Sequence, residues 1–109
     1  MFLLTTQFWI ELLEKNEDRK NELKLYDKDT ILLTPIILSE VSDYFIRKKN
    51  FRISNWFLEY STNTENVRII YTSKDENNLI IKLTNEKELS YNEATNQYIA
   101  EYFGAKIVL

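Results

Sequence analysis

The chain has no cysteine and no histidine among its 109 residues. Without cysteine it forms neither disulfides nor thiolate zinc sites, and without histidine it lacks the side chain that most often transfers protons at neutral pH. Any bound metal would therefore be held by oxygen ligands, which suit Mg²⁺ and Mn²⁺. The lack of cysteine also fits a reducing compartment, so we expect a cytoplasmic protein.

Glycine and proline are each present only once, at Gly104 and Pro35. One glycine cannot build a GxGxxG or Walker A loop, which excludes nucleotide binding of those types. Pro35 is expected in the first turn of a helix, where its missing N–H costs nothing. Gly104 is expected just after the end of another helix, where a left-handed residue stops the chain from continuing.

An excess of charge of one sign is also lacking, because 14 basic residues face 17 acidic ones and leave a net charge of −3. No global basic field therefore attracts nucleic acid or membranes. The apolar start, residues 1–15, has no basic leader and no small-residue cleavage site, so we expect no signal peptide. No apolar run approaches the roughly 20 residues of a membrane span. The length and the 44 % apolar content predict one domain, residues 1–109.

Short apolar runs separated by helical patterns predict an α/β protein. The runs expected to form strands are residues 2–5, 30–34, 67–71 and 106–109. Apart from Arg68 they show no polar alternation, which is typical of strands buried on both faces of a parallel sheet. Strands that alternate with helices predict a three-layer α/β/α sandwich around that sheet.

Two Ser-x-x-Glu sequences, residues 73–76 and 90–93, have the spacing of a helix-capping box. Each is expected to begin a helix. The first of these helices is expected to bury Leu79, Ile80 and Leu83 on one stripe.

One further helical pattern is rich in aromatic residues, with Trp56, Phe57 and Tyr60 on one stripe. These exceed what one surface helix of a small domain needs, which favours a dimer contact. The only basic cluster, residues 47–49 with Arg52, lies between this segment and the preceding helix. Two interpretations stay open for it: contact with RNA phosphates, or a solvated helix end favoured by the helix dipole.

Three segments carry a family resemblance: TTQFWIELLEKN after the first predicted strand, TPIILSEVSDYFIRKK after the second, and LSYNEATNQYIAEYFGAKIVL at the end of the sequence. In order and spacing they resemble the PIN-domain family, including the VapC-type toxins of prokaryotic toxin–antitoxin pairs, over nearly the whole chain. The resemblance implies a four-stranded parallel sheet in the order 3-2-1-4 that lacks the family's last strand.

Members of that family cleave RNA with Mg²⁺ or Mn²⁺ held by four acidic residues. Several carboxylates are needed because the cation must be held while it activates water beside a phosphate. By resemblance, Glu40 in LSEV matches the second acid and Glu93 in YNEA matches the third. Thr5 stands where the first acid is expected, and Thr6 matches the hydroxyl that follows it. The fourth acid is expected past Leu109, so this sequence is C-terminally short by comparison.

The resemblance therefore implies a PIN-like ribonuclease domain with impaired catalysis and weak or absent binding of Mg²⁺ or Mn²⁺. Glu40 and Glu93 are the candidate catalytic residues, and together with Thr5 they are the candidate metal ligands. The implied partners are RNA, an antitoxin-like protein and a second copy in a homodimer. Two other functions stay open: a non-catalytic interaction module for protein or RNA, and an active metal-dependent endoribonuclease that also uses Asp43.

Each candidate ligand also has a purely structural interpretation. Glu40 lies just beyond the apolar stripe of its predicted helix, where a solvated boundary residue is common. Glu93 occupies the third helical position of a capping box, and that position favours glutamate by itself. Thr5 ends a strand, where β-branched residues often serve packing.

Overall fold

The computed structural model describes all 109 residues. In chain order the elements are β1 (Phe2–Leu4), α1 (Thr6–Leu13), α2 (Glu17–Tyr26), β2 (Ile31–Leu33), α3 (Pro35–Arg47), α4 (Phe51–Asn63), β3 (Val67–Ile69), α5 (Lys74–Lys87), α6 (Tyr91–Phe103) and β4 (Lys106–Val108). All four predicted strands are present, each shorter than its apolar run. None of the helices combines the length and the apolar content that a membrane crossing requires.

The strands form one parallel sheet in the order β3-β2-β1-β4, which confirms the predicted order. Leu3 of β1 lies in register with Leu32 of β2 on one side and with Ile107 of β4 on the other. Because all strands run the same way, their carboxyl ends share one edge of the sheet. The segments that follow β1 and β2 therefore begin at the same edge of the sheet.

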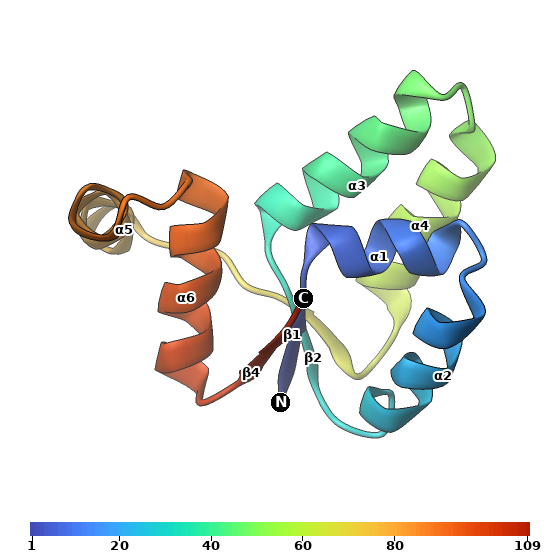
Figure 1. Ribbon diagram of the computed structural model, residues 1–109, viewed down its shortest axis with the longest axis horizontal. Helices are drawn as coiled ribbons and strands as arrows, with labels where there is room; N and C mark the ends of the chain where they lie inside the picture. The colour runs from blue at the N-terminus through green and yellow to red at the C-terminus, as the bar shows by residue number, and fades with distance from the viewer.

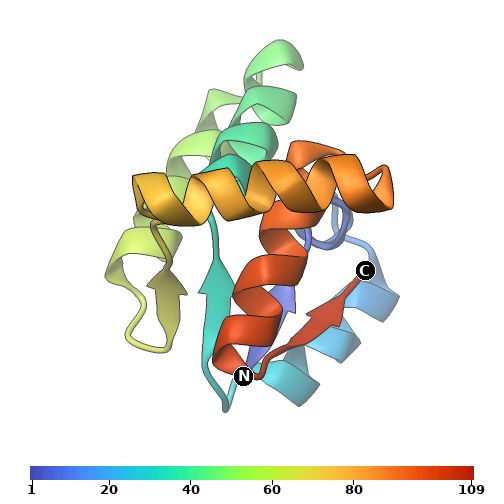
Figure 2. The same cartoon turned by 90° about the vertical axis from the view of Figure 1, so that its left-hand side faces the viewer.

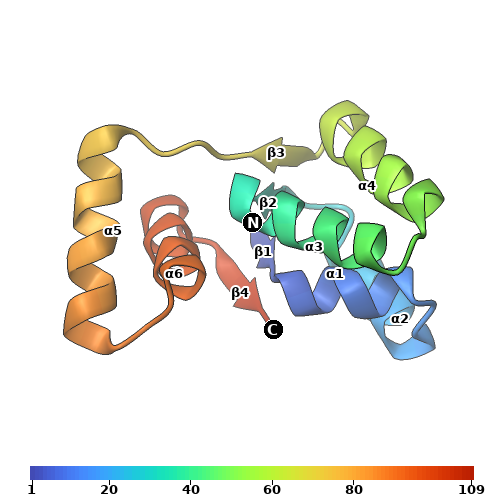
Figure 3. The ribbon, with the colours of Figure 1, turned by 90° about the horizontal axis from the view of Figure 1, so that it is seen from above.

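Helices cover both faces of this sheet, so the molecule has the predicted three layers (Figure 1). Helices α1 to α4 lie on one side, and α5 and α6 lie on the other (Figure 3). Helix α6 contacts β1 and β4, whereas α5 crosses the outer side of α6 (Figure 2). Only α6 therefore covers this face of the sheet directly.

The core is centred on the two inner strands. The strand residues with no exposed surface are Leu3, Leu4, Ile31, Leu32 and Leu33. Trp9 of α1 packs against Phe57 of α4 with ring centroids 5.1 Å apart, and both are fully buried. The edge strands differ from the prediction of burial on both faces, because Arg68 and Lys106 are exposed. An edge strand has a neighbour on one side only, and a single covering helix leaves part of it open to water.

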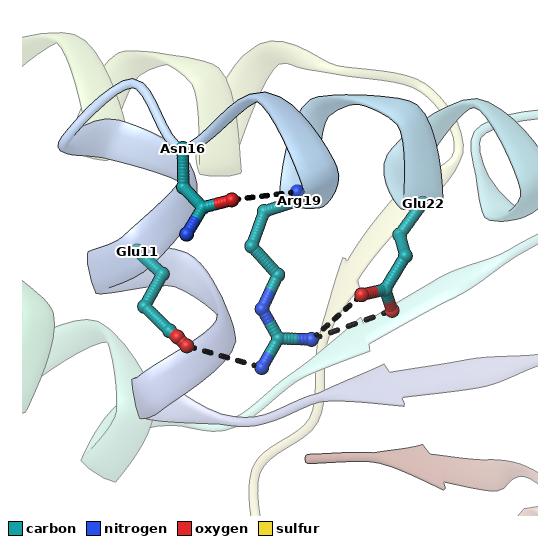
Figure 4. A network of polar contacts seen from close by, with 4 residues as sticks. All are labelled: Glu11, Asn16, Arg19 and Glu22. Carbon is teal, nitrogen blue, oxygen red and sulfur yellow. Dashed lines mark hydrogen bonds and ion pairs between the residues drawn. The ribbon is translucent and has the colours of Figure 1, made fainter.

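Arg19 fastens α2 to α1 (Figure 4). Its guanidinium bonds Glu11 of α1 at 3.2 Å and Glu22 of α2 at 3.1 Å, and its carbon Cζ lies 4.8 Å from the centre of the Phe8 ring. Asn16 accepts the backbone N–H of Arg19 at 3.2 Å and so caps α2. Helix α2 buries no residue completely, so these polar contacts are a large part of what positions it.

Local sequence signals set the helix ends as predicted. Both capping boxes are formed, at Ser73 and at Ser90. Pro35 lies in the first turn of α3. Gly104 ends α6 with a φ of +66°, a conformation that costs glycine nothing because it has no Cβ.

Two predictions about buried faces are wrong in part. Leu79 of α5 is 51 % exposed, although its neighbour Ile80 is fully buried. The reason is that α5 packs mainly on α6, which covers only a narrow stripe of it. On α4, Phe57 is fully buried and only Trp56, at 51 % exposed, presents a largely open aromatic surface. The stripe of Trp56, Phe57 and Tyr60 is therefore not one continuous external contact.

Candidate functional site

The carboxyl edge of the sheet brings the predicted site residues into one neighbourhood. Thr5 follows β1 and is the residue before α1. Glu40 lies on α3, which begins directly after β2, and Glu93 lies in the first turn of α6. In open parallel sheets ligands bind at this edge, outside the ends of the strands.

Glu40 is held by residues from two other helices. Its Oε1 accepts a hydrogen bond from the Thr6 hydroxyl at 2.8 Å and another from Asn92 Nδ2 at 2.5 Å. These bonds join α1, α3 and α6 around one carboxylate, so the segments that contain Thr5, Glu40 and Glu93 do meet. The predicted boundary position is also confirmed, because Glu40 is exposed.

The carboxylate of Glu93 is hydrogen-bonded to Ser90, the N-cap residue of its own helix. Its Oε1 accepts the backbone N–H of Ser90 at 3.1 Å, while the Ser90 hydroxyl accepts the backbone N–H of Glu93 at 3.1 Å. The backbone N–H of Ser90, helped by its hydroxyl, holds the pKa of Glu93 below its ordinary value. The carboxylate is therefore ionised at neutral pH and serves the capping box.

Thr5 directly follows β1, and its side-chain hydroxyl has an unusual environment. It caps α1 by position only, since its side chain makes no capping hydrogen bond. Its Oγ1 is buried and has no hydrogen-bond partner. Its backbone N–H donates to the carbonyl of Val108 at 3.1 Å, which fixes the residue at the end of the sheet. The Thr5 hydroxyl therefore lies inside the site without a hydrogen-bond partner in the protein.

These side chains do not fit a complete Mg²⁺ or Mn²⁺ site. The structure contains no group of three or more aspartate or glutamate side chains placed to hold one ion. Asp43, the further acid considered, forms an ion pair with Arg47 at 3.0 Å. Mg²⁺ demands a nearly ideal octahedron of oxygen ligands, and two carboxylates that already accept hydrogen bonds supply little of it.

A cavity of about 360 Å³ opens beside Glu40. Its lining residues are Thr5, Thr6, Gln7, Leu89, Asn92, Glu93, Asn96, Gln97, Ile107 and Leu109. Thr5 and Glu93 thus share one cavity, whereas Glu40 is outside the lining and reaches it through Thr6 and Asn92.

The sequence interpretation missed Asn92, Asn96 and Gln97 as site residues. A signal for two of them was present, because Asn92 and Asn96 are four residues apart and so lie on one face of α6. Asn96 is only 6 % exposed, which is unusual for an asparagine without a hydrogen-bond partner for its carbonyl oxygen.

The substitution Glu93→Gln is expected to lower the free energy of unfolding more at about pH 7 than at about pH 3. The pKa of Glu93 is lower in the folded chain than its ordinary value, so its stabilisation is present above the unfolded pKa of about 4.3. The stabilisation is lost as the pH falls through the folded pKa. Urea unfolding at both pH values measures this. The control is Glu101→Gln, an exposed position on α6; an equal loss in both variants, or a loss independent of pH, contradicts the capping role.

Solved structures of two other proteins have a fold similar to this one. Neither a protein-family model nor a curated protein matches the chain. Among solved structures, Mycobacterium tuberculosis VapC20, described as a sarcin–ricin loop cleaving toxin, aligns with a TM-score of 0.77 and 17 % identity over 96 % of this chain and 85 % of that one. A toxin–antitoxin complex from Klebsiella pneumoniae aligns with a TM-score of 0.79 and 17 % identity over 100 % of this chain and 85 % of that one. The chain therefore has the VapC-like PIN-domain fold that the sequence motifs predicted.

Proposed function

We propose that this chain is a PIN-like domain related to the Mg²⁺- or Mn²⁺-dependent ribonucleases of toxin–antitoxin systems, and that its RNA cleavage is impaired. The observation that carries the proposal is Thr5, a neutral residue at the end of β1 where the resemblance requires an acid. The fold and the meeting of the Thr5, Glu40 and Glu93 segments support the relationship to those ribonucleases.

Loss of one carboxylate matters because of charge as well as ligand number. A threonine hydroxyl is neutral and binds a hard divalent cation more weakly than a carboxylate does. Glu40 already accepts hydrogen bonds from Thr6 and Asn92. Glu93 already accepts one from the backbone N–H of Ser90. Recruiting them to a cation would require those bonds to be given up. The site is therefore suited to contacting a ligand more than to cleaving RNA.

Thr5→Asp is expected to raise Mn²⁺ affinity at least about tenfold, because it restores a charged oxygen ligand beside Glu93. Isothermal titration with MnCl₂ measures the affinity, and circular dichroism confirms that the variant is folded. Thr62→Asp, an exposed position on α4, adds the same charge outside this cavity and is the matched control. Equal Mn²⁺ affinity in both variants means that Thr5 does not occupy a former ligand position.

A second function, protein interaction, is favoured by a groove between α1 and α4. It has a volume of about 580 Å³ and is lined by Leu12, Leu13, Lys15, Asn50, Arg52, Ile53 and Trp56. Trp56 is half exposed there, so a partner that covered it would remove apolar surface from water.

The charges at this groove favour an acidic partner. Lys15 and Arg52 have no carboxylate within ion-pair distance, in contrast to Arg47 and Lys48 nearby, which pair with Asp43 and Glu14. An antitoxin-like segment with apolar and acidic side chains would match this surface. The similarity to the chain in the Klebsiella pneumoniae toxin–antitoxin complex supports this kind of partner. We expect the chain to bind such a partner in the cytoplasm. The alternative is that Trp56 and the rest of this groove form the interface of a homodimer.

If an antitoxin-like protein is encoded beside this chain, we expect the two to copurify after coexpression and the Trp56→Ala substitution to abolish the complex. The reason is that a half-buried aromatic ring in a groove is the type of residue that dominates binding energy. Leu58→Ala removes a similarly exposed side chain that does not line the groove and is the control. Size-exclusion chromatography with light scattering measures both the complex and any homodimer. A complex that survives Trp56→Ala, or a homodimer lost with it, contradicts the assignment of the groove to an antitoxin.

A further inference from the structure

A separate pocket of about 210 Å³ lies between α6 and residues 70–76, which lead from β3 into α5. The chain between β3 and α5 runs past α6 without regular secondary structure (Figure 3). The pocket shares no lining residue with the cavity at the carboxyl edge of the sheet. Pockets for drug-sized ligands have volumes of about 300 to 1,000 Å³. This smaller pocket therefore suits a compact chemical group.

Four aromatic rings dominate the lining of this pocket, those of Tyr71, Tyr98, Tyr102 and Phe103. The rings of Tyr98 and Tyr102 have centroids 6.4 Å apart and planes at 27°, whereas those of Tyr102 and Phe103 are 5.0 Å apart at 67°. Tyr71 is 74 % exposed and Tyr102 is 70 % exposed. The face of an aromatic ring carries partial negative charge and attracts cations. Several open rings with differently oriented planes therefore favour a cation as the ligand.

The charge of the lining favours a cation as well. Glu76 is its only charged residue, and no lysine or arginine belongs to it. The backbone N–H of Ser73, helped by the hydroxyls of Ser73 and Tyr98, holds the pKa of Glu76 below its ordinary value. The carboxylate is therefore ionised at neutral pH. A pocket with this single negative charge is complementary to a positive group and repels phosphate.

The rings at this pocket already attract one cation of the chain itself. The guanidinium carbon of Arg68, an exposed residue of the edge strand β3, lies 5.7 Å from the centre of the Phe103 ring. Cations within about 6 Å of a ring centre are attracted by the ring. The contact shows that this aromatic cluster accepts a positive charge at the protein surface.

The hydrogen bonds of Glu76 indicate which kind of cation fits. Its Oε1 accepts the backbone N–H of Ser73 at 2.9 Å, and its Oε2 accepts the Tyr98 hydroxyl at 3.1 Å. Both carboxylate oxygens are therefore already hydrogen-bonded. A primary ammonium group is strongly hydrated and would need new acceptors for its three N–H groups. A quaternary ammonium group has no N–H, so the negative charge and the aromatic faces satisfy it.

We propose that this pocket binds a small quaternary ammonium group. What carries the proposal is the position of the Glu76 carboxylate among four aromatic rings. The group occurs in free choline and in the headgroups of choline lipids. The inference is independent of the proposed relationship to ribonucleases, because the pocket contains none of the candidate site residues Thr5, Glu40 and Glu93.

The test is an NMR titration of the folded chain with choline and with its uncharged analogue, in which a carbon atom replaces the nitrogen. We expect choline to bind at least about fivefold more tightly, because only the charged ligand gains the attraction of the rings. The shifted backbone amides are expected to include those of Tyr71 and Tyr102. Equal affinity for the two compounds, or no binding of choline, overturns the proposal.

Cosedimentation with phosphatidylcholine vesicles separates the two sources of the ligand. A chain that binds choline and pellets with the vesicles recognises the lipid headgroup. A chain that binds choline and stays in solution recognises the free molecule. Either result supports a quaternary ammonium site.

Glu76→Gln is the diagnostic variant, because glutamine is also favoured at this capping-box position and only the charge is lost. It is expected to weaken choline binding about fivefold, and circular dichroism confirms that it is folded. Glu86→Gln is the matched control, because it removes the same charge about 15 Å further along α5. An equal loss in both variants means general attraction to an acidic chain and overturns the proposal.

Tyr102→Leu is the second variant should Glu76→Gln not fold. It removes an exposed ring but keeps an apolar side chain, so it is also expected to weaken choline binding about fivefold. Phe51→Leu, at an exposed aromatic position on α4 outside the pocket, is the control that keeps the affinity. Choline binding that is unchanged in both Glu76→Gln and Tyr102→Leu places the site elsewhere and overturns the proposal.

Discussion

The carboxylate of Glu40, shared by the Thr6 hydroxyl and the Asn92 amide, is the contact on which the site depends. It joins α1 and α3, on one side of the sheet, to α6 on the other, and holds them at the carboxyl ends of the strands. The parallel sheet makes this meeting possible, because every strand delivers its following loop to the same edge. The same bonds also occupy one of the two acids that a cation would need.

The chemistry proposed for the site follows from the neutral oxygens that line its cavity. Thr5, Asn92 and Asn96 place hydroxyl and amide groups around a cavity where a metal-dependent ribonuclease needs carboxylates. Neutral oxygens bind a divalent cation more weakly than carboxylates do, which is the basis of the proposed impairment.

The sequence predicted those features that local chemistry controls. The capping boxes at Ser73 and Ser90 and the glycine end of α6 depend on residues a few positions apart, and they are confirmed. The strand order came from the PIN-domain resemblance and is also confirmed. The exposure of Leu79 could not be predicted in this way, because it depends on how far α5 stands from the sheet. The amide residues of the cavity were missed for a similar reason. Asn96 comes to line the same cavity as Thr5 only after the strands have paired, and hydropathy treats Asn96 as an ordinary polar residue.

The most direct test of the proposed impairment is a crystal of the wild-type protein soaked in MnCl₂ and measured at the manganese absorption edge. Manganese scatters anomalously, so an ordered ion is located without reference to any assumed ligand. The account predicts no anomalous peak between Thr5, Glu40 and Glu93, with the Thr6 and Asn92 bonds to Glu40 still in place. A well-occupied manganese ion bound by Glu40 and Glu93 would contradict it.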